Sequence, residues 1–184
     1  MKKELQKHLL NVAKGSIARE LKIPFKMMES PKDNGLLNEK RGVFVTLKTH
    51  NRLRGCIGNI KPIYPLVEAV SKNAISAAFF DPRFVSLSKD EFTDLSIEIS
   101  VLTVPKKINY CDCDELCRML IPHKHGVVLK KGSCQSTYLP QVWEQIPDVE
   151  MFLGTLCQKA GLDMHVWRNS DIGVMTYEVE KFRD

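Results

Sequence analysis

The sequence predicts an α+β fold with a largely antiparallel sheet flanked by helices, and three observations predict it. Apolar residues recur at helical spacing in three separate segments, whereas shorter segments alternate apolar and polar residues as half-buried strands do. These segments lack the regular strand-helix-strand order of parallel α/β proteins. The chain has 184 residues, of which 43% are apolar, so we expect one packed domain over residues 1–184.

Three segments carry the periodicity of amphipathic helices. Residues 4–21 place apolar side chains at fourfold spacing, and residues 65–80 do so with several alanines, which implies close packing. Residues 149–160 follow Asp148, a good N-terminal cap, and precede Gly161, a good C-terminal stop. The sequence therefore predicts a helix in each segment.

The strands are predicted from alternation. Residues 42–48 and residues 95–101 alternate apolar and polar side chains, and the final strand is predicted at residues 175–179. Residues 127–129 and 134–139 flank a glycine-containing connection and predict a β-hairpin. Because a hairpin joins antiparallel strands, a largely antiparallel sheet is expected.

Composition limits the classes of function. Neither a signal peptide nor a membrane span is expected, so the protein is predicted to be cytoplasmic with its six cysteines reduced. Residues 40–61 hold six Lys or Arg and no carboxylate, which we interpret as a solvated basic face rather than a nucleic-acid site. Residues 29–35 are rich in polar and helix-breaking residues and predict an exposed loop.

Chemistry is concentrated at Arg54-Gly55-Cys56-Ile57-Gly58, which we expect to form a turn after a strand. Glycines allow tight bending and close approach of a ligand to the backbone, and successive turn N–H groups can bind an anion. Cations near a thiol favour the nucleophilic thiolate, so Cys56 is the candidate nucleophile. A cysteine packed beneath a β-bulge is the alternative, and the local sequence leaves both open.

Several motifs in the same order resemble the AMMECR domain family, whose prokaryotic form is called AmmeMemoRadiSam system protein A. These motifs are Arg41–Leu47, Leu53–Gly58, Asp81–Phe84, Ile99–Thr103, Gly126–Leu129, Thr137–Glu144 and Lys159–Leu162. Tyr138 stands where the family commonly has Phe. The resemblance implies an α+β fold with a cleft beside the Gly-Cys turn. It also implies a Memo-like protein and a radical SAM protein as partners, and it implies no established reaction.

The resemblance also extends the list of candidate site residues. Arg54, Gly55, Gly58, Asp81 and Arg83 are predicted to bind substrate around Cys56. Arginine suits carboxylate or phosphate groups because its guanidinium is a planar fork of donors. The alternative for Asp81 and Arg83 is an ion pair that fastens their loop.

A second group of candidates lies later in the chain. Thr137 and Gln141 are predicted to bind substrate, and Glu144 is a candidate acid or base. The alternatives are a solvated helix for Gln141 and Glu144, and strand pairing for Thr137.

A cluster of thiols invites comparison with metal sites. Cys111, Cys113 and Cys117 precede His123 and His125, but the spacing matches neither a zinc knuckle nor the cluster motif of radical SAM enzymes. Helical packing accounts for at least two of the thiols. We therefore expect no bound metal and no cofactor.

The sequence leads to one preferred function and two alternatives. The preferred hypothesis is a component of a Memo and radical SAM-associated pathway that binds a small anionic substrate or modified group near Cys56, with thiol-assisted catalysis. The first alternative is a non-catalytic adaptor that docks a Memo-like or radical SAM partner. RNA binding through residues 40–61 is the weaker alternative.

Overall fold

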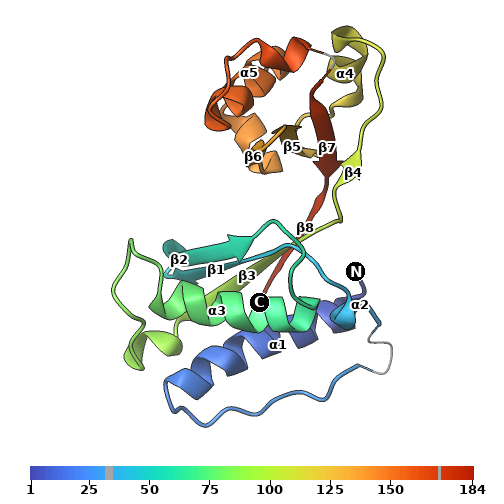
Figure 1. Cartoon of the computed structure of the whole chain (residues 1–184). Coiled ribbons are helices and arrows are strands. Elements are labelled where there is room, and N and C mark those ends of the chain that lie inside the picture. Colours follow the sequence, from blue (N-terminus) through green and yellow to red (C-terminus); the bar gives the residue numbers. More distant parts are fainter. Residues whose placement is uncertain (32–34, 170) are drawn as a thin grey trace. The chain divides into compact units, whose positions relative to one another are not determined.

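The computed structural model describes residues 1–31, 35–169 and 171–184, arranged in two compact units (Figure 1). Unit 1 comprises Met1–Leu102 and Glu180–Asp184, and unit 2 comprises Thr103–Val179. Both combine helices with antiparallel strands, so the predicted α+β class is confirmed. Part of the loop expected at residues 29–35, namely residues 32–34, lies outside the described residues.

Unit 1 is built on a four-stranded sheet in the order β2-β1-β3-β8. These strands are β1 (Val43–Thr49), β2 (Arg52–Asn59), β3 (Leu95–Leu102) and β8 (Val179–Arg183). β1 pairs antiparallel with both β2 and β3. His50 and Asn51, both with positive φ, connect β1 to β2, as the favoured two-residue hairpin turns require.

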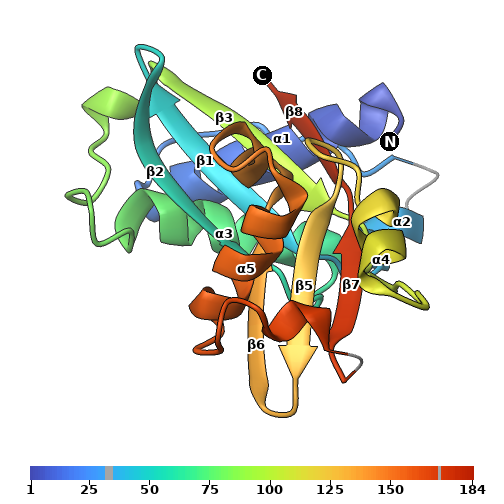
Figure 2. The ribbon, with the colours of Figure 1, turned by 90° about the horizontal axis from the view of Figure 1, so that it is seen from above.

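Helices cover one face of this sheet (Figure 1). They are α1 (Lys3–Glu20), α3 (Leu66–Phe79) and the short α2 (Gly35–Asn38), and a 3-10 turn, η1 (Asp90–Phe92), precedes β3. Figure 2 shows β2, β1 and β3 side by side with α1 and α3 behind them. Buried Leu9 and Ile17 of α1 pack in one core with Val45 and Ile97 of the sheet. The helices predicted at residues 4–21 and 65–80 are thus confirmed.

Unit 2 has its own four-stranded sheet in the order β4-β7-β5-β6. Its elements are β4 (Lys106–Lys107), α4 (Cys113–Met119), β5 (Gly126–Lys131), β6 (Cys134–Tyr138), η2 (Pro140–Glu144), α5 (Val149–Lys159), η3 (Val166–Arg168) and β7 (Gly173–Tyr177). The predicted hairpin is β5 and β6, with Gly132 at positive φ. Asp148 caps α5 as predicted, and Trp143 stacks on Phe152 with ring centroids 3.6 Å apart.

The strand predicted at residues 175–179 differs from the structure. β7 ends at Tyr177, and β8 begins at Val179 in the other sheet. Glu178 separates the strands because its N–H donates to Thr103 Oγ1, while its carbonyl accepts from the Thr103 N–H, both at 2.9 Å. Residues 95–101 and 175–177 are therefore strands of two antiparallel sheets, not of one.

None of the helices in the described part of the chain has the length and apolarity needed to span a bilayer.

Candidate functional site

The Arg54–Gly58 segment is a strand and not the expected turn. It lies in β2, paired with β1, and the turn precedes it at His50 and Asn51. Its glycines serve close packing: a Cβ on Gly55 would overlap the Ala77 carbonyl of α3, and one on Gly58 would overlap the Phe44 ring. The anion-binding nest expected from turn N–H groups is therefore replaced by a strand edge.

A β-bulge places the side chain of Arg54. Leu47 pairs with Gly55, whereas Lys48 pairs with Leu53, so Arg54 is the additional residue in β2. Its side chain is buried, and Cys56 beyond the bulge is partly exposed. A β-bulge was the alternative to a reactive thiol in the sequence analysis. The bulge is present, but the residue buried at it is Arg54 and not Cys56.

The backbone N–H and carbonyl of Cys56 are both hydrogen-bonded by the loop that follows α3. The Cys56 N–H donates to Asp81 Oδ2 at 2.9 Å, and the Cys56 carbonyl accepts from Arg83 Nη2 at 3.3 Å. β2 is an edge strand, so these backbone groups face away from β1 and would otherwise be unpaired. Asp81 and Arg83 therefore close the edge of the sheet at the thiol.

Asp81 and Arg83 are also bonded to each other. Asp81 accepts from Arg83 Nη2 at 2.7 Å and from Arg83 Nε at 2.9 Å, although Asp81 itself is buried. Hydrogen bonds from the Arg83 side chain, together with the Cys56 N–H, hold the pKa of Asp81 well below its usual range despite the opposing effect of burial. The Arg83 side chain remains 54% exposed. The ion pair considered from the sequence is present, and substrate binding by these residues stays a prediction.

Arg54 is bonded to a different carboxylate. Its Nε donates to Glu91 Oε1 at 2.6 Å, and its Nη2 donates to the Val85 carbonyl at 2.8 Å. The hydrogen bond from Arg54 is the main cause that lowers the pKa of Glu91 to about 2. Arg54 Nη1 is buried without a hydrogen-bond partner among the described residues. Arg54 thus fastens β2 to residues 85–91, and its predicted contact with substrate stays a prediction.

The thiol lies on the face of the sheet opposite α3, together with a row of polar side chains. Cys56 Sγ lies 3.2 Å from Thr46 Oγ1, and Thr46 is the register partner of both Cys56 and Glu98. Glu98 Oε2 accepts from Lys48 Nζ at 3.3 Å, and Glu98 Oε1 lies 3.2 Å from Lys181 Nζ. Burial alone would raise the pKa of Glu98, but the hydrogen bonds and charges of the two lysines outweigh it and lower the pKa.

Sequence reasoning missed this row, which joins Cys56 to Thr46, Glu98, Lys48 and Lys181. Alternation in β1 and β3 does place Thr46 and Glu98 on polar faces. That signal shows which face a residue occupies, but it does not show which residues of two strands are opposite one another.

The remaining candidates lie in unit 2. Thr137 Oγ1 is 3.2 Å from Tyr177 Oη, and burial raises the pKa of Tyr177 to about 12. Gln141 and Glu144 are exposed on η2, as the solvated-helix alternative described. The roles predicted for Thr137, Gln141 and Glu144 stay predictions.

The three neighbouring cysteines are placed by α4. Cys113 and Cys117 are partly buried against the core of unit 2, and Cys113 Sγ donates to the Arg168 carbonyl at 3.3 Å. Cys111 is exposed. Within residues 1–31, 35–169 and 171–184, no three His, Cys, Asp or Glu side chains converge as a metal site would require. Whether the purified protein carries a metal stays a prediction.

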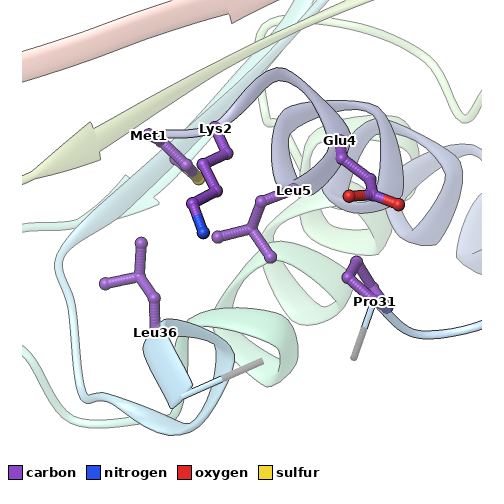
Figure 3. Close-up of a pocket in the computed structure, with 6 residues that line it drawn as sticks. All are labelled: Met1, Lys2, Glu4, Leu5, Pro31 and Leu36. Atoms are coloured by element: carbon purple, nitrogen blue, oxygen red, sulfur yellow. The ribbon is translucent and has the colours of Figure 1, made fainter. Parts of the chain in front are cut away.

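Three cavities are lined by residues other than Cys56 and its neighbours in β2. The largest of them, about 210 Å³, is lined by Met1, Lys2, Glu4, Leu5, Pro31 and Leu36 (Figure 3). Others of about 150 Å³ and 190 Å³ are lined by Asp148 and residues of η3, and by residues of α1 with the segment after it. The cleft expected beside the Gly-Cys segment stays a prediction.

Comparison with known proteins identifies the family. The AMMECR1 family model matches residues 10–182, nearly the whole chain. The chain belongs to the AMMECR1 family. It is 39% identical to Protein MK0488 of Methanopyrus kandleri over 184 residues, which is 96% of this chain and 86% of that protein. It is 39% identical to Protein PH0010 of Pyrococcus horikoshii over 195 residues, which is 100% of this chain and 92% of that protein.

A solved structure of this AMMECR1 family supports the same fold. The crystal structure of the uncharacterized protein PH0010 from Pyrococcus horikoshii superimposes with a TM-score of 0.78 at 40% identity. The match covers 100% of this chain and 93% of that one. The family resemblance drawn from the sequence motifs is therefore confirmed, while the names of these relatives state no reaction.

Proposed function

We propose that this AMMECR1-family protein acts in a pathway with a Memo-like and a radical SAM protein, binding a small anionic substrate or modified group beside Cys56. The single observation that carries the proposal is a partly exposed thiol on a residue whose backbone N–H and carbonyl are both hydrogen-bonded by a neighbouring loop. Asp81 accepts from the Cys56 N–H, Arg83 donates to the Cys56 carbonyl, and Thr46 Oγ1 lies within hydrogen-bond distance of the Cys56 sulfur. Fixed placement of a nucleophile is what thiol-assisted chemistry needs.

The residues around Cys56 have distinct parts in this proposal. Arg83 is exposed enough to meet a ligand, whereas Arg54 is buried in its pair with Glu91 and supports the strand. Gly55 and Gly58 let α3 and Phe44 approach β2 closely. In this proposal Cys56 is the reactive group, Arg83 contacts the ligand, and Arg54 supports the strand.

Alkylation of the native protein tests the proposal. Iodoacetamide should modify Cys56 before Cys157, because Cys157 is fully buried and burial raises its pKa. Peptide mass spectrometry at successive times measures the order, and unfolding in urea should release Cys157. Cys56→Ser should abolish pathway turnover by the three proteins together, while Cys134→Ser, a change to another partly exposed thiol, should not. A Cys56 that is unreactive in the folded chain would exclude thiol chemistry.

A specific observation favours the adaptor as second candidate. Phe80 and Val85, which flank the Asp81–Phe84 motif, are 72% and 82% exposed, more than any other large apolar side chain described. Neighbouring exposed apolar groups are common at protein contacts. An adaptor would use them to dock the Memo-like or radical SAM partner.

Substitution of these two residues separates the candidates. Phe80→Ser with Val85→Ser should remove co-elution with a Memo-like or radical SAM protein if docking is the function, and leave the alkylation rate of Cys56 unchanged. Ile121→Ser with Met119→Ser provides the matched control, because these exposed apolar residues belong to unit 2. Retained co-elution of the Phe80 and Val85 variant would count against the adaptor.

RNA binding is less favoured by the arrangement of cations in residues 40–61. Arg41 pairs with Glu39, Lys48 with Glu98, and Arg54 with Glu91. Half of the six cations therefore face carboxylates contributed from outside the segment. RNA binding that weakens steeply with added salt would support this alternative.

A further inference from the structure

The two arginines near Cys56 are both paired with carboxylates, so they do not supply the free positive charge that the motifs suggest. Arg54 of the Leu53–Gly58 motif is neutralised by Glu91, with Arg54 Nε 2.6 Å from Glu91 Oε1. Arg83 of the Asp81–Phe84 motif is neutralised by Asp81, with Arg83 Nη2 2.7 Å from Asp81 Oδ2. Each pair sums to zero charge, so neither provides a surplus that attracts an anion over a distance.

A surplus of one positive charge lies on the same face of the sheet as the thiol. Lys48 and Lys181 share one carboxylate, with Glu98 Oε2 3.3 Å from Lys48 Nζ and Glu98 Oε1 3.2 Å from Lys181 Nζ. Two cations and one anion leave a net charge of +1. Each ammonium carries three N–H donors, and the contact with Glu98 occupies one of them. The Glu98 side chain is only 14% exposed, so it is held between the lysines.

Register places this charge within reach of a ligand at the thiol. Thr46 of β1 stands between Cys56 of β2 and Glu98 of β3, and neighbouring strands are about 4.8 Å apart. The backbone of Glu98 is therefore roughly 10 Å from that of Cys56. Lys48 lies on β1 two residues from Thr46 and projects from the same face. These separations are close to the screening length of about 8 Å at physiological ionic strength.

We propose that Lys48 and Lys181 bind the carboxylate of a small monoanionic ligand whose other end reaches the Cys56 thiol, with the Thr46 hydroxyl between them. This inference rests on the proposed function, because it assigns the anionic end of the ligand to residues outside the Gly-Cys motif. The net charge of +1 matches one carboxylate. Glu98 holds the two ammonium groups apart and in place, so it is a positioning residue.

Two alkylating reagents that differ in charge test the assignment without knowledge of the natural ligand. Iodoacetate and iodoacetamide both transfer a two-carbon group to sulfur as iodide leaves, but only iodoacetate is an anion. The quantity measured is the ratio of their rate constants at Cys56, obtained by peptide mass spectrometry. The neutral reagent reports accessibility and folding, so the ratio isolates the effect of local charge.

The lysine substitutions should lower that ratio. In Lys48→Gln with Lys181→Gln, we expect the iodoacetate to iodoacetamide ratio to fall roughly fivefold, because two nearby cations are removed. Glu98→Gln should raise the ratio, since the net charge of the group becomes +2. Lys3→Gln with Lys7→Gln is the matched control, because it also removes two positive charges and both lysines are exposed on α1, in the helical layer on the other face of the sheet.

The outcomes separate this inference from the proposed function. A ratio unchanged in the double lysine variant, with Cys56 still reactive toward iodoacetamide, overturns the inference and leaves the thiol proposal standing. A Cys56 that reacts with neither reagent overturns both. A ratio that falls equally in the variant with Lys3→Gln and Lys7→Gln reports general charge and also overturns the inference.

Discussion

Asp81 illustrates how one side chain organises the candidate site. It accepts four hydrogen bonds, one from the Cys56 N–H and three from the backbone N–H, Nε and Nη2 of Arg83. A buried carboxylate is costly unless such donors surround it. Asp81 thereby links the Cys56 backbone to the loop after α3, while the Cys56 thiol is partly exposed.

This arrangement predicts a pH-dependent effect of Asp81→Asn. Because the pKa of Asp81 is lower in the folded than in the unfolded chain, its ionised form stabilises the fold above the usual carboxyl pKa of about 4. That contribution is lost as the pH falls through the lower, folded-state pKa. Wild type should be more stable than Asp81→Asn near neutral pH, and the difference should shrink below about pH 4.

Urea unfolding at about pH 7, 5 and 3 measures this difference. Asp90→Asn is the control, because Asp90 is exposed and close in the chain. A constant difference between wild type and Asp81→Asn at all three values would contradict the electrostatic account.

At the scale of elements, the position of β2 depends on its crossing with α3. Gly55 faces the Ala77 carbonyl so closely that no side chain fits between strand and helix. The alanines of α3 contribute to this contact, since Ala74 and Ala77 are buried in the same core. Small residues on both elements therefore bring the Cys56 strand against the helix that leads into the Asp81–Phe84 loop.

Gly55→Ala should be destabilising because its Cβ would force β2 and α3 apart. We expect a loss of roughly 1–3 kcal/mol in the free energy of unfolding, the range for overpacked sites. Gly35→Ala is the control: it has open space around its Cβ and should change stability by no more than about 1 kcal/mol. Chemical denaturation measures both, and equal stability of Gly55→Ala and wild type would refute the packing argument.

At the scale of the molecule, the residues that the structure describes form two cores with no residue in common. The core of unit 1 draws on residues up to Val101 and on Phe182, whereas that of unit 2 draws on residues between Ile108 and Val174. Thr103 and Glu178, near the two ends of unit 2, are hydrogen-bonded to each other. Unit 2 is therefore an insertion between β3 and β8, and the prediction of one domain over residues 1–184 stays a prediction.

Residues 103–179 should fold by themselves, because their core and all four strands of the β4-β7-β5-β6 sheet lie within that range. Both tryptophans, Trp143 and Trp167, are buried in this unit, so fluorescence reports its unfolding alone. We expect the isolated fragment to reproduce the fluorescence transition of the full chain in urea. A fragment without a cooperative transition would support one indivisible domain.

Metal content is a further property of the whole protein. Because core packing accounts for Cys113 and Cys117, we expect elemental analysis after mild purification to give far less than one zinc or iron per chain. The variant with Cys111, Cys113 and Cys117 changed to Ser is the control. One metal per chain in wild type, absent from this variant, would overturn the structural interpretation of these thiols.

The sequence by itself determined what depends on local periodicity and on motifs. Spacing located α1, α3 and α5, alternation located β1 and β3, and the motif around Cys56 indicated the AMMECR1 family. These signals are local because a helix or strand repeats its pattern along its own length.

Tertiary structure decided which distant groups meet. It made Arg54–Gly58 a strand, divided residues 175–179 between two sheets, and paired Arg54 with Glu91 and Lys48 with Glu98. The physical reason is that alternation shows a residue's face, whereas register, bulges and loop closure set its partner. The charges beside Cys56 follow from that register, which the order of residues alone does not reveal.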